Sequence, residues 1–371
     1  MKNSLLLISG IYPPDTGGPA SFTEDFAQWL SQNNEKVSVV TYTDGPSQTK
    51  YFDSIKITYI HRYENLPRRY ICFAWSILRN YNSKVRVLAV GAFLETMLAN
   101  MVRNINYTIK IPGDIVWERA RNSGKTDLDI NDFQVSNLNF KYRIFRKLFT
   151  LSIARATHVV VPSEFLQKLV AGWIGKSKPI ELIYNSIDTS RFSNSDITNR
   201  RFDVITACRL VPWKGVDELI RCCDELGLTL GIAGEGPEEE KLKQQASKLG
   251  AAVTFLGQIP KDEISDFYRS GEIFVLNSSY EGLPHALIEA KAIGLLCIGR
   301  SGTGSEEVIK HLEDGILVNE ELGSNLKEAL FTAISNPDLV KTLRLNARND
   351  VSSRFDRDVN FKNIYKILVE A

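Results

Sequence analysis

The chain lacks the features of secreted, membrane-spanning and nucleic-acid-binding proteins. Its five cysteines are scattered and form neither a Cys-x-x-Cys pair nor a Cys/His ligand set, which predicts buried, reduced thiols. No apolar run approaches the ~18 residues of a transmembrane helix. The first apolar run, residues 2–11, lacks a small-residue cleavage site and is predicted to be a strand. With 45 basic and 44 acidic side chains, there is no basic excess for nucleic acid. We therefore expect a soluble, cytoplasmic protein.

The chain is rich instead in short apolar runs that alternate with helical patterns. Its 371 residues suffice for two domains, and the polar stretch at residues 192–201 has the composition of a linker. The alternation predicts βαβ units, and hence an α/β fold with two doubly wound parallel sheets. The expected strands are residues 4–11, 36–41, 85–90, 107–111, 158–162 and 180–183, then 203–208, 228–233, 253–256, 273–276, 295–298 and 315–318.

Two carboxylates lie eight positions apart in Glu281-Gly-Leu-Pro-His-Ala-Leu-Ile-Glu289. Pro284 is tolerated only in the first turn of a helix, so we expect Glu281 in the preceding loop and Glu289 inside the helix. Predicted strands on both sides put this loop at the carboxyl edge of a parallel sheet, where ligands bind. The alternative is a pair of solvated charges. In the first case the earliest backbone N–H groups would form an anion site, namely those of Leu283, His285 and Ala286.

Three further loops are expected at the same edge. Arg209 and Lys214 follow the first strand of the second domain and would neutralise a diphosphate, although each alone could be a solvated charge. Gly234-Glu-Gly-Pro237 follows the second strand, and the glycine-rich stretch 301–307 follows the strand after Glu289. Jointly, the four loops predict a site for a ligand that is part polyol and part phosphate, such as a nucleotide sugar.

The first strand of the chain leads into another glycine-containing loop, at residues 12–21. Gly17 and Gly18 permit positive φ and a close approach of the backbone to a ligand. The loop lacks both the Lys-Ser/Thr of a P-loop and the Gly-x-Gly-x-x-Gly of a dinucleotide fold. A plain turn after a strand is the alternative.

Together these motifs resemble those of retaining GT-B glycosyltransferases of family 4, over nearly the whole chain. The resemblance implies two Rossmann-like domains that face a central cleft. The acceptor domain would span residues 1–188, with a helix at residues 356–371 packing back onto it, and the nucleotide-sugar domain would span residues 189–355. The motifs that carry the resemblance are the Gly17-Gly18 loop, Tyr184-Asn-Ser-Ile-Asp188, Arg209…Lys214-Gly215, Gly234-Glu-Gly-Pro237, Phe255-Leu-Gly257, Glu281-x7-Glu289 and Gly302/Gly304…Glu307.

The resemblance also implies roles for single residues. Arg209 and Lys214 would hold the donor diphosphate, Glu281 would meet the sugar, and Glu289 would accept hydrogen bonds from ribose hydroxyls. No cofactor and no obligatory metal are implied, and the Asp-x-Asp spacing at residues 127–129 falls in a polar loop outside any donor-binding context. The other implied donor-binding residues are Gly17, Gly18, Gly234, Gly257, Gly282, Leu283, Pro284, His285 and Ala286.

One position departs from the family. Many members have a histidine after the strand near residue 110, where this chain has Asp114, followed by Trp117, Glu118 and Arg119. In one interpretation Asp114 is catalytic and orients the attacking hydroxyl, while Trp117 stacks on a sugar and its two neighbours contribute contacts. In the other, Asp114 merely caps the loop.

A basic amphipathic helix is predicted at residues 140–153, where Phe140, Ile144 and Phe149 alternate with Arg143 and other cations. Such a helix can lie on an anionic membrane, which would suit a lipid-linked acceptor and a peripheral location at the inner face of the membrane. The alternative is an ordinary helix with its aromatic residues in the core.

The activity implied is that of a retaining, hexosyltransferase-type glycosyltransferase. It would move a sugar from a UDP or GDP donor to a glycan or lipid-linked acceptor, in bacterial-type polysaccharide or glycolipid assembly. Two alternatives share the architecture: a nucleotide-sugar 2-epimerase, and a non-catalytic nucleotide-sugar binder that regulates a partner. The Glu-x7-Glu spacing argues against the epimerase, and the intact set of Arg209, Lys214, Glu281 and Glu289 argues against the regulator.

Overall fold

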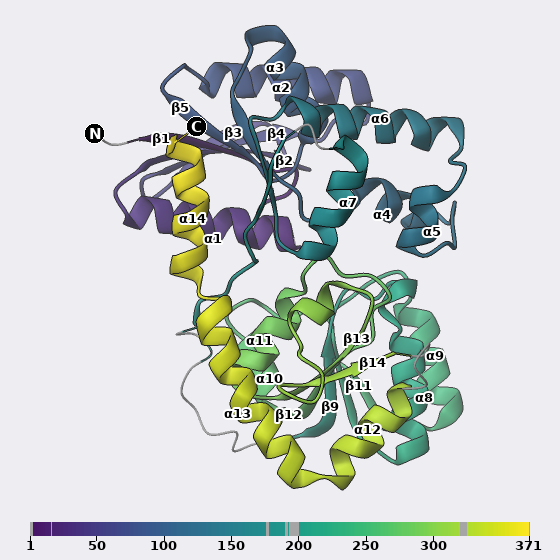
Figure 1. The fold of residues 1–371 in the computed structure, drawn as a ribbon. Coiled ribbons are helices and arrows are strands. Elements are labelled where there is room, and N and C mark those ends of the chain that lie inside the picture. Colours follow the sequence, from purple (N-terminus) through teal and green to yellow (C-terminus); the bar gives the residue numbers. More distant parts are fainter. Residues whose placement is uncertain are drawn as a thin grey trace. The chain divides into compact units, whose positions relative to one another are not determined.

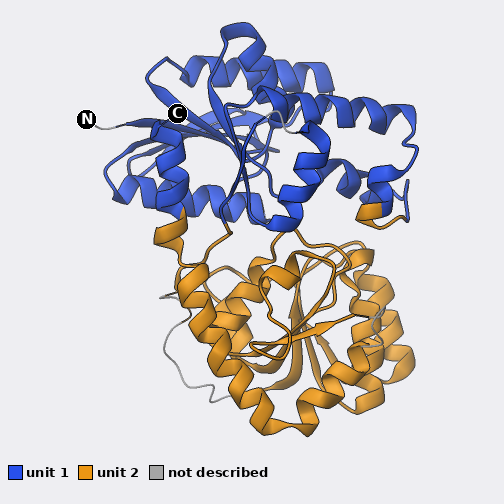
Figure 2. Cartoon of the chain, in the orientation of Figure 1, with its two compact units in different colours: residues 1–127, 132–183, 361–371 blue, residues 128–131, 184–360 orange. Residues whose placement is uncertain are grey.

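The computed structural model describes residues 3–15, 17–175, 178–189, 192, 200–319 and 325–370. The chain divides into two compact units (Figure 2). Unit 1 comprises Met1–Asp127, Asp132–Ile183 and Phe361–Ala371, and unit 2 comprises Leu128–Asn131 and Tyr184–Asn360. Most of the linker expected at residues 192–201 lies outside the described residues. Each unit contains a largely parallel sheet covered by helices, which confirms the predicted α/β class (Figure 1).

Unit 1 is built on an eight-stranded sheet with the order β3-β4-β2-β1-β5-β6-β7-β8 in its described part. All neighbouring strands are parallel except β3 and β4, which form an antiparallel hairpin that the sequence did not predict. The strands are β1 (Ser4–Ile8), β2 (Lys36–Thr43), β3 (Gln48–Phe52), β4 (Ile55–His61), β5 (Val85–Ala89), β6 (Tyr107–Lys110), β7 (His158–Val161) and β8 (Ile180–Leu182).

Crossover helices join the strands of unit 1. They are α1 (Gly18–Gln32), α2 (Leu66–Asn80), α3 (Phe93–Arg103), α4 (Ile115–Asn122), α5 (Ile130–Val135), α6 (Phe140–Arg155) and α7 (Glu164–Ile174). The final helix, α14 (Arg357–Glu370), contributes Phe361 to the same core as α1. The Phe361 ring lies 5.1 Å from that of Phe26 in an edge-to-face contact, a geometry that stabilises beyond area burial alone. Helix α14 is therefore an integral part of unit 1.

Unit 2 contains a six-stranded sheet in its described residues, with the order β11-β10-β9-β12-β13-β14 and every pair parallel. Counted within the unit, this is the 3-2-1-4-5-6 order of doubly wound nucleotide-binding folds. The order reverses between β9 and β12, so the ligand site is expected beyond the carboxyl ends of those two strands. The strands are β9 (Phe202–Ala207), β10 (Leu230–Ala233), β11 (Val253–Phe255), β12 (Gly271–Leu276), β13 (Leu296–Arg300) and β14 (Ile316–Val318).

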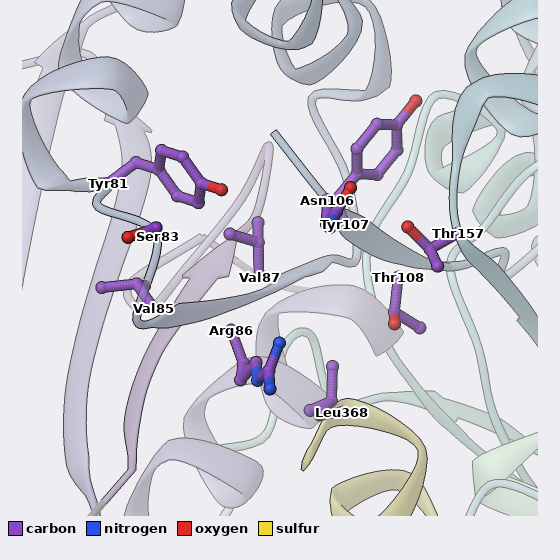
Figure 3. A pocket seen from close by; sticks show the side chains of 10 residues that line it. All are labelled: Tyr81, Ser83, Val85, Arg86, Val87, Asn106, Tyr107, Thr108, Thr157 and Leu368. Carbon is purple, nitrogen blue, oxygen red and sulfur yellow. The ribbon is translucent and has the colours of Figure 1, made fainter. Parts of the chain in front are cut away.

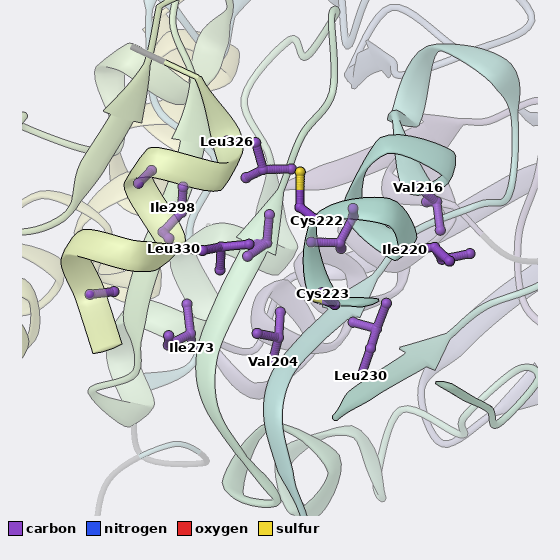
Figure 4. Close-up of a cluster of buried hydrophobic side chains, with 14 of the residues drawn as sticks. Val204, Val216, Ile220, Cys222, Cys223, Leu230, Ile273, Ile298, Leu326 and Leu330 are labelled. Carbon is purple, nitrogen blue, oxygen red and sulfur yellow. The ribbon is translucent and has the colours of Figure 1, made fainter. Parts of the chain in front are cut away.

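The helices of unit 2 cover both faces of its sheet. They are α8 (Val216–Leu226), α9 (Glu239–Leu249), α10 (Ile264–Arg269), α11 (His285–Ile293), α12 (Leu326–Ser335) and α13 (Pro337–Arg354). On one face, side chains such as Val204, Leu230 and Ile298 from the strands meet Ile220 and Leu330 from the helices (Figure 4). This packing fixes the strand ends from which the candidate site is built.

Candidate functional site

A cation and a carboxylate meet at the point where the strand order of unit 2 reverses. Lys214 ends the short helix η2 (Pro212–Lys214) after β9, and Glu281 lies in the loop after β12. The Nζ of Lys214 donates to Oε1 of Glu281, although the residues are 67 positions apart in sequence. Their side chains are 16% and 12% exposed, so the pair is only partly screened by solvent. The two residues singled out from different motifs therefore form one charged cluster.

The backbone around Lys214 is held by the neighbouring loop. Gly215 adopts φ of 62°, and a Cβ there would lie 2.6 Å from the carbonyl oxygen of Asn277. The Ser279 amide donates to the Trp213 carbonyl at 2.9 Å. A side chain at Gly215 would therefore force the β9 and β12 loops apart and displace Lys214.

The loop after β13 closes on the same place. Its short helix η3 (Gly304–Glu307) begins with Gly304, whose amide donates to the Glu281 carbonyl at 2.9 Å. A Cβ on Gly304 would overlap the Gly282 carbonyl, so glycine is required for this approach. The 301–307 stretch thus contacts the Glu281 loop directly, while its contribution to ligand binding stays a prediction.

The β10 loop packs against the loop that carries Arg209. Gly234 has φ of 122°, and a Cβ on it would overlap the Cys208 carbonyl. The Gly234 amide donates to the Gly257 carbonyl at 2.7 Å and the Leu210 amide to the Glu235 carbonyl at 2.9 Å, so backbone hydrogen bonds join the loops after β9, β10 and β11. The Arg209 side chain is exposed and makes no hydrogen bond or ion pair within the part of the chain that the structure describes. Burial raises the pKa of the Cys208 thiol to about 11, so Cys208 is unsuited to act as a thiolate nucleophile.

Helix α11 begins at His285, one residue after Pro284, and Pro284 provides no side-chain cap. The backbone at Gly282, Leu283, His285 and Ala286 thus lies where a helix N-terminus favours anions. The sequence predicted Pro284 in the first turn of this helix. In the structure it is the N-cap, one position before that turn.

Glu289 lies in the second turn of α11, as predicted from its spacing. The hydroxyl of Tyr268 donates to Oε2 of Glu289 at 2.8 Å. Tyr268 is 1% exposed, and its burial beside this carboxylate raises the pKa of the phenol, which therefore stays a donor. Tyr268 was not identified in the sequence because a short helix of mixed polar and apolar residues has no distinctive pattern.

A buried lysine behind the site was also missed. Lys291 is fully buried in α11, and its Nζ lies 2.8 Å from Asp314 and 2.7 Å from Asp350. It also donates to the Val308 carbonyl, just after η3. Lys291 thereby ties α11 to α13 and to the end of the loop that contacts Glu281. The sequence feature that could have revealed it is a single lysine among the mostly apolar residues of α11.

In unit 1, the Gly17-Gly18 loop leads directly into a helix, as expected. Gly17 has φ of 138° and serves as the N-cap of α1, while Gly18 is its first residue. Asp15, in the same loop, pairs with Arg62 at 2.8 Å. The loop follows β1, beside the point where the strand order of this sheet reverses between β1 and β5. Its position therefore suits a ligand contact.

Asp114 is fully buried, and its carboxylate is used within unit 1. Oδ1 accepts from the Val116 and Trp117 amides at 2.9 and 3.1 Å, which caps α4. Oδ2 accepts from Gln134 at 3.0 Å and from Arg146 at 2.9 Å. The sequence left two interpretations of Asp114 open, an acceptor-orienting group and a cap. The observed geometry is that of a cap.

The neighbours of Asp114 differ in exposure. Trp117 is 1% exposed, which corrects the prediction that it stacks on a sugar, because its ring is enclosed in the core. Glu118 is half-buried, and the exposed Arg119 lies over the Phe145 ring at 4.6 Å. The apolar character that suggested sugar stacking instead anchors α4 to its unit.

A small pocket in unit 1 lies at the opposite edge of the sheet. Its walls include Val85 and Val87 in the first half of β5, and Tyr107 and Thr108 at the start of β6 (Figure 3). Ligands of doubly wound sheets bind at the carboxyl ends of strands, so this pocket is not the candidate site.

Comparison with known proteins identifies the domain that carries the Lys214–Glu281 pair. Residues 188–350 match the family described as glycosyl transferases group 1. This part of the chain is a glycosyl transferases group 1 domain. An uncharacterized glycosyltransferase of Methanocaldococcus jannaschii is 23% identical over 99% of this chain and 98% of its own length. With such relatives along nearly its whole length, the chain is a glycosyltransferase.

Characterised relatives and solved structures agree with that class. A GDP-mannose-dependent alpha-(1-6)-phosphatidylinositol monomannoside mannosyltransferase of Mycolicibacterium smegmatis is 30% identical over 53% of this glycosyltransferase and 56% of its own length. Sucrose-phosphate synthase from Thermosynechococcus elongatus aligns with a TM-score of 0.81 and 17% identity, covering 100% and 99% of the two chains. Anabaena HepE, solved with UDP and glucose, aligns with a TM-score of 0.77 and 18% identity over the full length of both. These likenesses give the fold, which is GT-B.

Proposed function

We propose that this glycosyltransferase is a retaining family 4 enzyme that moves a hexosyl group from a UDP- or GDP-sugar to an acceptor hydroxyl in polysaccharide or glycolipid assembly. The observation that carries the proposal is the Lys214–Glu281 pair at the strand-order reversal of unit 2, where Lys214 follows β9 and Glu281 lies in the loop leading to α11. Names of similar proteins support the donor class: one uses GDP-mannose, and another was solved with UDP.

The proposed chemistry needs charge on the leaving group to be stabilised. In a retaining transfer, the acceptor hydroxyl attacks the anomeric carbon on the face from which the nucleoside diphosphate departs. Lys214 and Arg209 would neutralise the developing diphosphate charge, and the N-terminal amides of α11 would add to that field. When donor binds, Nζ of Lys214 would be shared between Glu281 and a phosphate oxygen. Glu289, oriented by Tyr268, would accept from the ribose hydroxyls.

Residues Arg209 and Lys214 provide the positive charge that a metal ion supplies in other transferases, so we infer that no metal is required. Asp127, from the Asp-x-Asp spacing, is fully exposed and pairs with Arg121 at 3.2 Å. The Asp114 carboxylate is occupied by its cap and by Arg146, so the acceptor is expected to be oriented by other groups.

The decisive experiment incubates the purified chain with a panel of UDP- and GDP-sugars, with and without candidate glycan and glycolipid acceptors, in EDTA. We expect nucleoside diphosphate release that depends on acceptor, and a product with the anomeric configuration of the donor by NMR. Acceptor-independent conversion of the sugar to its C2 epimer would instead identify an epimerase. Donor binding without turnover against any acceptor would favour a regulator, and an inverted product would overturn the retaining mechanism. Loss of activity in EDTA that Mg²⁺ restores would overturn the metal-free site.

A further inference from the structure

Helix α6 carries an unusual apolar stripe on its outer surface. Phe140, Ile144, Leu148 and Leu151 are 68%, 42%, 37% and 42% exposed. Their spacing of four, four and three residues puts them on one face of the helix. The opposite face, with Phe149 and Ile153, packs into unit 1. Helix α6 is therefore apolar on two sides, and only one of them is covered by the unit.

The neighbouring helices extend this stripe into a wider surface. Helix α3 packs against both α2 and α6, so the three lie side by side on one face of the sheet (Figure 1). On α2, Ile71 and Trp75 are 65% and 59% exposed and one turn apart. At the end of α3, Met101 and Val102 are 59% and 74% exposed. We call the outward surface of α2, α3 and α6 the three-helix face.

The helices are also joined at their C-terminal ends. Arg103 of α3 donates to the Leu78 carbonyl of α2 at 3.4 Å. Arg155 of α6 donates to the Asn100 side chain of α3 at the same distance. Met101 and Val102 thus lie between the ends of α2 and α6, and the exposed apolar side chains belong to one continuous layer.

The charged side chains of these helices are almost all positive. The described helices α2, α3 and α6 contain nine lysines and arginines but a single acid, Glu95, which is 4% exposed. The chain as a whole has 45 basic and 44 acidic residues, so this layer departs strongly from the average. Seven of the cations are exposed, and none forms an ion pair with a described residue: Arg68, Arg79, Arg103, Lys141, Arg143, Lys147 and Arg155.

Helix α9 of unit 2 shows what an ordinary exposed helix of this protein looks like. Its Lys241 and Lys243 pair with Glu238 and Glu239 at 2.7 Å, and acids and bases are interspersed along it. Such pairing is absent from the described part of the three-helix face. Exposed apolar side chains among unpaired cations suit a surface that is both apolar and anionic.

We propose that the three-helix face docks in the plane of an anionic lipid bilayer. Amphipathic helices bind membranes by inserting an apolar face about 5–10 Å into the headgroup boundary while their cations contact anionic lipid headgroups. Trp75 suits the interfacial region, where tryptophan is enriched. Among the described residues, no helix has the length and apolar character needed to span a bilayer. The inference extends the proposed function by naming the surface that would bring the enzyme to a lipid-linked acceptor.

The test is co-sedimentation of the full chain with vesicles of two compositions. One contains phosphatidylcholine alone, and the other contains phosphatidylcholine with, by design, 30% phosphatidylglycerol. We expect binding to the anionic vesicles that weakens at high salt, and little binding to the neutral ones. Ile144→Ser with Leu148→Ser should lower the partition coefficient at least tenfold. The matched control is Phe331→Ser with Leu345→Ser, which removes apolar side chains 58% and 63% exposed on unit 2 and should change nothing.

Charge and tryptophan variants make the test sharper. Lys141→Gln with Lys147→Gln should weaken binding about fivefold per charge, whereas Lys243→Gln with Lys248→Gln on α9 should not. The emission of Trp75 should shift to the blue on binding, and Trp75→Phe should abolish the shift. The proposal would be overturned if variants on the three-helix face and the control variants had equal effects on binding. It would also be overturned if the protein bound anionic and neutral vesicles equally. A change of oligomeric state without lipid in the Ile144/Leu148 variant would identify a self-association surface instead. Vesicle binding needs no turnover, so its outcome is separate from that of the donor panel.

Discussion

The two sheets use the charged residues near their carboxyl edges in different ways. In unit 2, Lys214 and Glu281 meet in a partly exposed pair, and Arg209 points into solvent. In unit 1, Lys110 is the last residue of β6 and Asp114 lies in the loop after it, yet both are buried within the fold. A site that binds a charged ligand has to leave its charges reachable. The contrast indicates that unit 2 provides ionic chemistry, whereas unit 1 uses these two charged groups for its own architecture.

The largest expected effect comes from breaking the charged cluster of unit 2. Lys214→Ala should lower kcat/KM by about 30- to 1,000-fold, corresponding to roughly 2–4 kcal/mol of lost transition-state stabilisation on the leaving group. Steady-state kinetics with the identified donor measures it. Lys243→Ala, an exposed lysine on α9, is the control and should keep full activity. Wild-type turnover by Lys214→Ala would remove Lys214 from the proposed site.

Asp114→Asn should mainly affect stability, because it leaves the mostly buried Arg146 without its counter-charge. We expect the free energy of unfolding to fall by about 2–3 kcal/mol, below the range for fully buried pairs since Arg146 is 16% exposed. Denaturant titration provides this value, and donor affinity should stay unchanged because the proposed donor site is in unit 2. If stability is kept but transfer per folded molecule is slow, Asp114 has the acceptor role that the sequence first suggested.

The most gradual effect should appear as a pH dependence of the stability of unit 1. Burial lowers the pKa of Lys110 to about 7, whereas in the unfolded chain it is near the ordinary 10.4. Between these values the unfolded state binds more protons, so the contribution of Lys110 makes stability rise with pH, by at most about 1.4 kcal/mol per pH unit. Lys110→Met should lack this rise and be the more stable form at pH 7.

Unfolding curves of wild type and Lys110→Met from pH 7 to 10 isolate this contribution, since the raised thiol and phenol pKa values act equally in both proteins. Lys84→Met, at an exposed lysine of the same unit, should reproduce the wild-type slope. A stability difference between wild type and Lys110→Met that is constant with pH would show that Lys110 is not neutralised by burial.

Prediction from sequence succeeded where the physics is local. The apolar runs of strands β12 and β13 and the break at Pro284 were sufficient to put Glu281 in a loop at a sheet edge. The pairing of Lys214 with Glu281 could not be predicted, because the two residues are 67 positions apart and meet only through the order of the strands in the sheet. The β3–β4 hairpin was missed since all five residues of β3 are exposed, so its sequence lacks a buried face.

Burial in three dimensions was the other limit. The segment from Asp114 to Arg119 is composed like a binding loop, and only the positions of Gln134 and Arg146 reveal that the carboxylate is occupied. Lys291 could be noticed as a charge in an apolar helix, but its partners Asp314 and Asp350 come from distant segments. The sequence therefore indicates which side chains could bind a ligand or take part in a reaction. Whether those side chains are free to do so depends on their tertiary contacts.

The packing of α14 has a consequence for the order in which the protein is made. Phe361, Ile364 and Leu368 belong to the core of unit 1, but the ribosome synthesises them after all of unit 2. At about 5–20 residues per second, unit 1 waits on the order of ten seconds or more for its last helix after Ile183 is added. During that interval the side of α1 with Phe22, Phe26 and Trp29 has no Phe361 to pack against. Unit 2, nearly all of it one continuous segment, can fold first, so the nascent chain is most exposed to chaperones and aggregation through its N-terminal half.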